Sequence, residues 1–114
     1  SDSEMRVAFW YGVRGSEPKD VSVIYEDSGS PGQLVRSAFI VRVLDASGLP
    51  IDGITPEVTV ESGRATIQAI EPIGDIPGTW VVSTRISTLQ AINSYVIFRV
   101  KAGDVSTLAY VLVE

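Results

Sequence analysis

Apolar and polar residues alternate along several short stretches of the chain. In residues 37–45, Phe39, Val41 and Val43 fall on one side of an extended chain and Arg42 falls on the other. Because successive side chains of a strand point to opposite faces, this period of two predicts strands with one buried and one solvated face. Strands of this kind are typical of antiparallel sheets, since parallel strands are usually buried on both faces.

Clusters of Gly, Pro, Asp and Ser separate these stretches, and the longest clusters are 27–33, 45–53 and 71–78. The stretch 86–94 is rich in Ser, Thr and β-branched residues, so we expect a loop there rather than a helix. About eight short strands with frequent turn signals predict an all-β fold, an antiparallel β-sandwich of about seven to eight strands. The predicted strands are 5–13, 21–26, 37–45, 57–61, 64–70, 79–86, 94–100 and 105–113.

A one-sided sheet cannot bury its own apolar face, so two sheets are expected to pack together. The core between them is predicted to be formed by the inward residues of the clearest alternating strands. These residues are Phe39, Val41, Val43, Trp80, Val82 and Phe98.

The amino-acid composition argues against several classes of function. The 114 residues suffice for one domain, the formal net charge is −5, and the two lysines and seven arginines are scattered, which argues against nucleic-acid binding. Histidine and cysteine are absent, which removes thiol nucleophiles, Cys/His zinc sites and His-based acid–base catalysis. We therefore expect neither an enzyme nor a cofactor. No apolar run approaches the ~20 residues of a membrane-spanning helix, so membrane insertion is not expected.

Two kinds of candidate site stand out. Asp45, Asp52 and Asp75 lie in predicted turns, where carboxylates either hold Ca²⁺ or cap the turn by local hydrogen bonds. We favour turn capping and keep calcium as the weaker alternative. In residues 5–13, alternation places Trp10 on the same face as Arg6. We favour a Trp10 that is covered by a loop or by a neighbouring domain of the parent protein, and we keep as the alternative a Trp10 that contacts a protein or glycan ligand.

Residues 21–113 contain the segments SPGQLVRSAFIVRVLDASGLPIDG, VTVESGRATI, PGTWVVSTR and FRVKAGDVSTLAYVLV. In these segments the chain resembles the bacterial immunoglobulin-like domains of the invasin/intimin type and, more loosely, filamin-type repeats. The resemblance implies that residues 21–114 form an immunoglobulin-like antiparallel β-sandwich. It also implies that residues 1–20 are an N-terminal extension with an extra edge strand.

The resemblance also implies a function without catalysis. We expect a structural or spacer module of a larger bacterial surface, adhesion or secreted protein, whose partners are the neighbouring domains of the parent protein. The alternative is a binding module for carbohydrate or a protein partner that uses the aromatic residues near 5–13. The expected location is extracellular or at the cell surface, and a cytoplasmic location stays open because the absence of cysteine fits either compartment.

Overall fold

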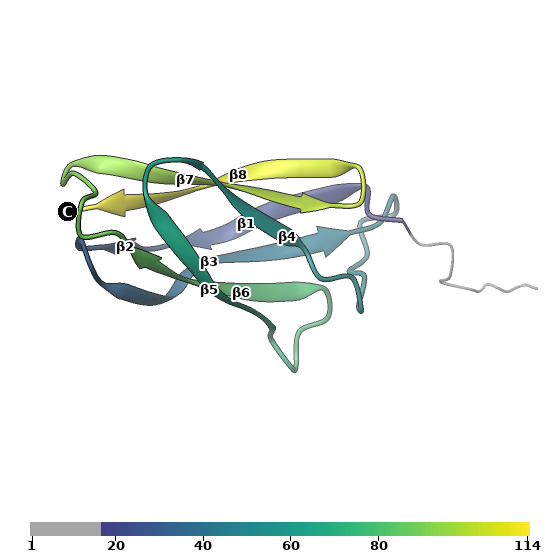
Figure 1. Ribbon diagram of the computed structural model, residues 1–114. Coiled ribbons are helices and arrows are strands. Elements are labelled where there is room, and N and C mark those ends of the chain that lie inside the picture. The colour runs from purple at the N-terminus through teal and green to yellow at the C-terminus, as the bar shows by residue number, and fades with distance from the viewer. Residues whose placement is uncertain (1–16) are drawn as a thin grey trace, which may run out of the picture.

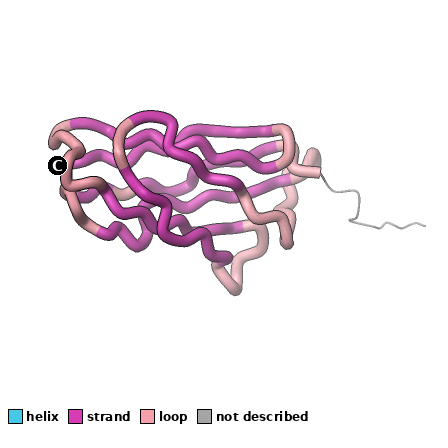
Figure 2. Tube along the Cα trace, in the orientation of Figure 1, coloured by secondary structure: helices cyan, strands magenta, loops and turns pink. Residues whose placement is uncertain are grey.

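The computed structural model describes residues 17–114, and these residues form strands, turns and loops without a helix (Figures 1 and 2). Accordingly, no helix in the described part of the chain has the length and hydrophobicity needed to span a membrane. The strands are β1 (Asp20–Glu26), β2 (Ser28–Gly29), β3 (Leu34–Leu44), β4 (Glu57–Ser62), β5 (Ala65–Pro72), β6 (Thr79–Ile86), β7 (Ser94–Ala102) and β8 (Val105–Val113).

The strands form two four-stranded sheets that face each other (Figure 1). One sheet has the order β1-β3-β6-β5 and the other has the order β2-β8-β7-β4. All pairings are antiparallel except the short pairing of β2 with β8, which is parallel. This strand order is that of a constant-type immunoglobulin sandwich, with the short strand β2 added to the second sheet. The predicted all-β sandwich is confirmed.

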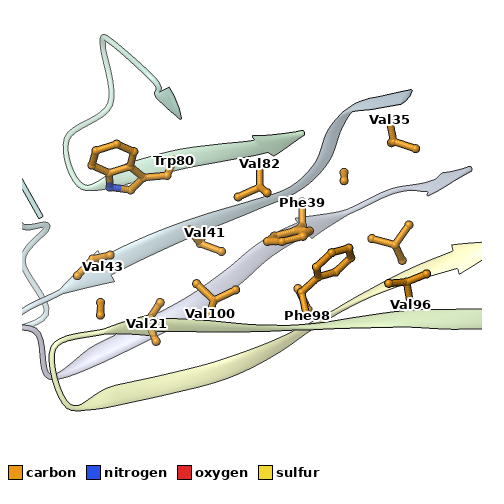
Figure 3. Packing of buried hydrophobic residues seen from close by; sticks show 14 of the residues in the cluster. Val21, Val35, Phe39, Val41, Val43, Trp80, Val82, Val96, Phe98 and Val100 are labelled. Atoms are coloured by element: carbon orange, nitrogen blue, oxygen red, sulfur yellow. The ribbon is translucent and has the colours of Figure 1, made fainter. Parts of the chain in front are cut away.

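The core lies between the two sheets and is built from alternate residues of β3, β6, β7 and β8. Phe39 and Phe98 reach across from opposite sheets, and their ring centroids lie 5.1 Å apart at a tilt of 42° (Figure 3). Trp80 closes the core toward one end of the sandwich. The other predicted core residues, Val41, Val43 and Val82, are fully buried as well. Alternation along the strands therefore places these side chains inside.

The chain enters and leaves the sandwich at opposite ends (Figure 1). We call the end where β1 begins the N-terminal pole; it contains the loops 45–56, 73–78 and 103–104. There the Lys19 N–H donates to the Leu44 carbonyl at 2.9 Å. We call the other end the C-terminal pole; it contains the loops 30–33, 63–64 and 87–93 and the end of β8. A chain under tension between its ends would therefore be pulled along the long direction of the strands.

The loop after β3 has the turn geometry that its residues predict. Gly48 and Gly78 have φ angles of +81° and +66°, a region that glycine adopts without the clash of a Cβ atom. A Cβ at Gly78 would also lie 2.8 Å from the Cβ atom of Pro50. Gly78 therefore allows the loops 45–56 and 73–78 to pack directly against each other.

Two features differ from the sequence expectation. β3 begins at Leu34 rather than at residue 37, and β2 forms within the stretch that we expected to be a polar loop. Both result from tertiary pairing, because β3 gains partners on β6 from Leu34 onward and β2 pairs with β8. The predicted extra edge strand at 5–13 lies outside the described residues.

Candidate functional site

The acidic candidates lie in turns. The Asp45 carboxylate accepts hydrogen bonds from the N–H groups of Ser47 and Leu49 at 2.8 and 3.0 Å. The Asp52 carboxylate accepts the Gly78 N–H at 2.9 Å and so ties the loop 45–56 to the loop 73–78. The Asp45 bonds are the local capping that Asp provides in turns, whereas the Asp52 bond joins two loops that are 26 positions apart.

The structure brings only part of the predicted calcium set together. Asp52 and Asp75 line the same hollow at the N-terminal pole, and Asp45 is not among its lining residues. In residues 17–114, no group of three or more acidic side chains is arranged to hold a metal ion. Calcium binding stays a prediction. The other predicted contact residues, Trp10 and Arg6, lie outside the described part of the chain.

A cluster of hydrogen bonds joins the first strands of the domain to the last one. We call this cluster the terminal-strand junction; its residues are Glu26, Ser28, Gly29, Tyr110 and Glu114. The Glu26 carboxylate accepts the backbone N–H of Tyr110 at 2.7 Å, and the Ser28 hydroxyl donates to the Glu114 carboxylate at 2.8 Å. The Glu114 N–H donates to the Gly29 carbonyl at 2.9 Å. These bonds link β1 and β2 to β8 across the edge of the sandwich.

Gly29 allows the junction to form because the backbone of β2 lies directly on the core. An added Cβ at Gly29 would stand 2.5 Å from Cγ2 of Val35 and 2.9 Å from Cδ1 of Ile86. Both of these side chains are buried. Only a residue without a side chain therefore lets β2 approach closely enough to pair with β8.

A shallow hollow with aromatic and acidic walls lies beside the junction. The rings of Tyr95 and Tyr110 meet edge to face, with centroids 5.9 Å apart and an interplanar angle of 88°. Both tyrosines are exposed. The hollow has a volume of about 580 Å³ and is lined by Glu26, Asp27, Ser28, Tyr95, Tyr110 and Leu112. Its two carboxylates give it negative charge, so it suits a ligand that combines an apolar surface with hydrogen-bond donors or positive charge.

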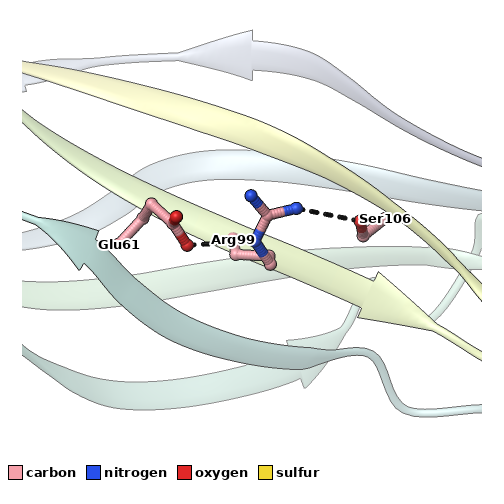
Figure 4. Close-up of polar contacts among 3 residues, drawn as sticks. All are labelled: Glu61, Arg99 and Ser106. Atoms are coloured by element: carbon pink, nitrogen blue, oxygen red, sulfur yellow. Dashed lines mark hydrogen bonds and ion pairs between the residues drawn. The ribbon is translucent and has the colours of Figure 1, made fainter.

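The outer face of the second sheet carries an ion pair that connects three strands (Figure 4). Arg99 on β7 donates from Nε to the Glu61 carboxylate on β4 at 3.0 Å and from Nη1 to the Ser106 hydroxyl on β8 at 3.1 Å. The hydrogen bond and charge of Arg99 lower the pKa of Glu61, and Glu61 raises the pKa of Arg99. Both side chains are well exposed, so the pair adds little to stability.

The sequence signals did not reveal the terminal-strand junction. Glu26, Ser28 and Glu114 are polar residues that contact partners more than 80 positions away, and no local pattern predicts such pairs. The signal that could have suggested β2 is Gly29, a glycine that stands in a polar stretch between two predicted strands. A glycine there is consistent with a close approach of backbone to core as well as with a turn.

Comparison with known proteins finds solved structures that share this fold. No protein-family model and no curated protein sequence matches the chain. The solved domains 4 and 5 of the S-layer protein SbsC are similar, with a TM-score of 0.61 and 18% identity over 86% of this chain and 53% of that chain. A longer structure of the surface layer protein SbsC, domains 4–9, gives a TM-score of 0.63 and 17% identity over 87% of this chain and 14% of that one.

The C-terminal domain of ZirS is also similar, with a TM-score of 0.64 and 15% identity over 100% of this chain and 80% of that chain. At these identities the likeness shows a shared fold. The chain spans about half the length of the structure of SbsC domains 4 and 5. The resemblance to the invasin/intimin type stays a prediction, since no family model supports it.

Proposed function

We propose that this chain is a non-catalytic structural module of a larger bacterial surface or secreted protein, which spaces neighbouring domains and transmits tension between them. Support comes from the likeness to domains of a surface layer protein. Residues 17–114 also lack histidine and cysteine, and the loop aspartates Asp45 and Asp52 accept backbone hydrogen bonds that hold the loops in place.

The observation that carries the proposal is the way the first and last strands are joined. β1 begins at the N-terminal pole and β8 ends at the C-terminal pole (Figure 1). Between the poles, β2 and β8 run parallel, with Ser28 opposite Leu112 and Gly29 opposite Val113. Tension on the two chain ends therefore pulls β2 and β8 past each other along their length.

This direction of force is the one that a strand pairing resists best. Inter-strand hydrogen bonds cross from one strand to its neighbour, at a slant in a parallel pair such as β2 with β8 and roughly perpendicular in an antiparallel pair, so a pull along the strands loads all of them together. A pull across the strands would break them one after another, starting at one end. The pairing of β1 with β3, which extends from Asp20 to Glu26, is loaded in the same way and adds to the resistance.

Single-molecule stretching of the chain by its two ends tests the proposal. Replacing Glu26 with Ala removes the acceptor of the Tyr110 N–H in the junction, and we expect a lower unfolding force. Glu61→Ala is the matched control, since it removes an exposed carboxylate on β4 that pairs with Arg99 and lies outside the junction. Equal unfolding forces for the two variants would refute a mechanical role of the junction.

A binding role is a second candidate, favoured by the hollow beside Tyr95 and Tyr110. Exposed tyrosines stack on sugar rings or peptide groups, and the carboxylates of Glu26 and Asp27 can accept hydrogen bonds from them. Titration with a glycan panel and with basic peptides, followed by the NMR signals of the tyrosine rings, tests this role. Unchanged signals with every ligand would reject it at this hollow.

A further inference from the structure

The hollow beside Tyr95 and Tyr110 lies where the first strands of the domain meet the last ones. Three of its lining residues, Glu26, Asp27 and Ser28, lie on β1, on β2 or between them, and the other three lie on β7 and β8. Glu26 and Ser28 also form hydrogen bonds of the terminal-strand junction. A ligand that fills the hollow therefore contacts both sides of this junction at once.

The aromatic wall of the hollow forms a corner. Tyr95 and Tyr110 are 53% and 41% exposed, and their rings stand at 88° to each other. Perpendicular rings do not form one flat platform, so a sugar ring can stack on only one of them. A planar cation suits the corner better, because it can lie over the face of one ring while its edge donates hydrogen bonds to an acceptor nearby.

The acidic wall supplies such acceptors. The Asp27 carboxylate accepts the Ser28 N–H through Oδ1 at 2.8 Å, and the Glu26 carboxylate accepts the Tyr110 N–H through Oε2 at 2.7 Å. Each of these bonds uses only one of the two carboxylate oxygens. In the described part of the chain, neither Lys nor Arg is among the lining residues of the hollow. The negative charge of this wall is therefore complementary to a cation that comes from a partner.

We propose that this hollow holds the arginine side chain of a partner protein, an assignment that rests on the binding role given above as the second candidate. The guanidinium group stacks on a tyrosine ring and donates hydrogen bonds to the carboxylates of Glu26 and Asp27. An arginine fits better than a lysine, whose compact and strongly hydrated ammonium group has no flat face.

The bound arginine also strengthens the terminal-strand junction. It contacts Glu26 and Asp27 at the ends of the first strands and the tyrosines on β7 and β8, so it adds a link across the pairing of β2 with β8. A ligand that binds only the intact hollow stabilises the intact state. Binding of the partner therefore raises the resistance of the domain to tension.

Titration of the full chain with a glycine–arginine–glycine peptide with blocked ends tests the binding. The NMR signals of the Tyr95 and Tyr110 rings report on it, and the matched peptide carries citrulline, which has nearly the shape of arginine without its charge. We expect saturable shifts with the arginine peptide and an affinity about tenfold lower with the citrulline peptide. Equal affinities, no shift with either peptide, or tighter binding of a neutral oligosaccharide would overturn the proposal.

Variants of the protein test the acidic wall. Glu26→Gln and Asp27→Asn remove the charge but keep an oxygen that can accept the same backbone N–H, so we expect the double variant to fold and to bind the arginine peptide about tenfold less tightly. The matched control is Glu71→Gln, which changes an exposed carboxylate on β5 in the other sheet and should leave binding unchanged. Equal binding by the double variant and the control would overturn the proposal. If the double variant does not fold, the two peptides on the unchanged chain still decide.

Stretching the chain by its two ends, with and without the arginine peptide, tests the link to the junction. At a saturating peptide concentration we expect a higher unfolding force for the unchanged chain and no rise for the double variant. An unchanged force with the peptide bound would overturn the strengthening of the junction. Failure here is distinguishable from failure of the structural role, because Glu26→Ala and Glu61→Ala test that role without any peptide.

Discussion

Replacing Gly29 with Ala tests whether the close approach of β2 to the core holds the terminal-strand junction in place. The new Cβ would lie 2.5 Å from Cγ2 of Val35, well inside van der Waals contact. Val35 cannot turn away easily, because a buried valine has few allowed rotamers. The added Cβ would also lie 2.9 Å from Cδ1 of Ile86, so Ile86 prevents a shift of the backbone toward its side. Overpacking of this kind costs about 1–3 kcal/mol.

For a domain of this size, that cost corresponds to a fall in Tm of roughly 5–20 °C. Urea unfolding followed by tryptophan fluorescence measures this cost as a lower midpoint with an unchanged slope. Gly74→Ala is the matched control, since an added Cβ there meets nothing within 4 Å. If Gly29→Ala unfolds at the same midpoint as Gly74→Ala, β2 does not lie on the core as described.

Three further changes have expected outcomes. Phe98→Ala removes the ring that meets Phe39 across the core and should cost about 3–5 kcal/mol in the free energy of unfolding, measured by chemical denaturation. Glu61→Gln should lower Tm slightly at neutral pH; because the pKa of Glu61 is depressed in the folded state, the difference from wild type should disappear as the pH falls below 4.5 toward that depressed pKa. Asp45→Ala leaves the Ser47 N–H without its acceptor and should lower the free energy of unfolding by about 1 kcal/mol. If Ca²⁺ raises the melting temperature of the wild type but not that of the variant, Asp45 binds the ion instead.

The sandwich was predictable because its main signals are local. Alternation places Phe39 and Val41 inside and Arg42 outside without knowledge of the partner strands. The turn after β3 was equally predictable from the sequence, since an Asp followed by Gly and Pro has a limited set of backbone conformations. Asp45 and Gly48 adopt the capping and positive-φ roles that these residue types suggest.

The terminal-strand junction was not predictable, because it depends on distant pairings between polar residues. Glu26 receives its hydrogen bond from a strand 84 positions away. The register that brings β2 beside β8 follows only once both sheets are formed. The same holds for the hollow beside Tyr95 and Tyr110, whose lining residues come from β1, β2, β7 and β8 and from Asp27 between β1 and β2. Long-range geometry of this kind has no periodic signature in the sequence.

The central claim is that the terminal-strand junction resists tension between the two chain ends. The direction of pulling tests this claim most directly. With the first attachment point fixed at the N-terminal end of the chain, the second is placed either after Glu114 at the C-terminal pole or at Asp104, the loop residue just before β8 at the N-terminal pole. The first geometry shears β2 against β8, and the second peels β8 away from its starting end. We predict a clearly higher unfolding force when the chain is pulled by Glu114. Equal forces in the two geometries, or a higher force from Asp104, would contradict the account.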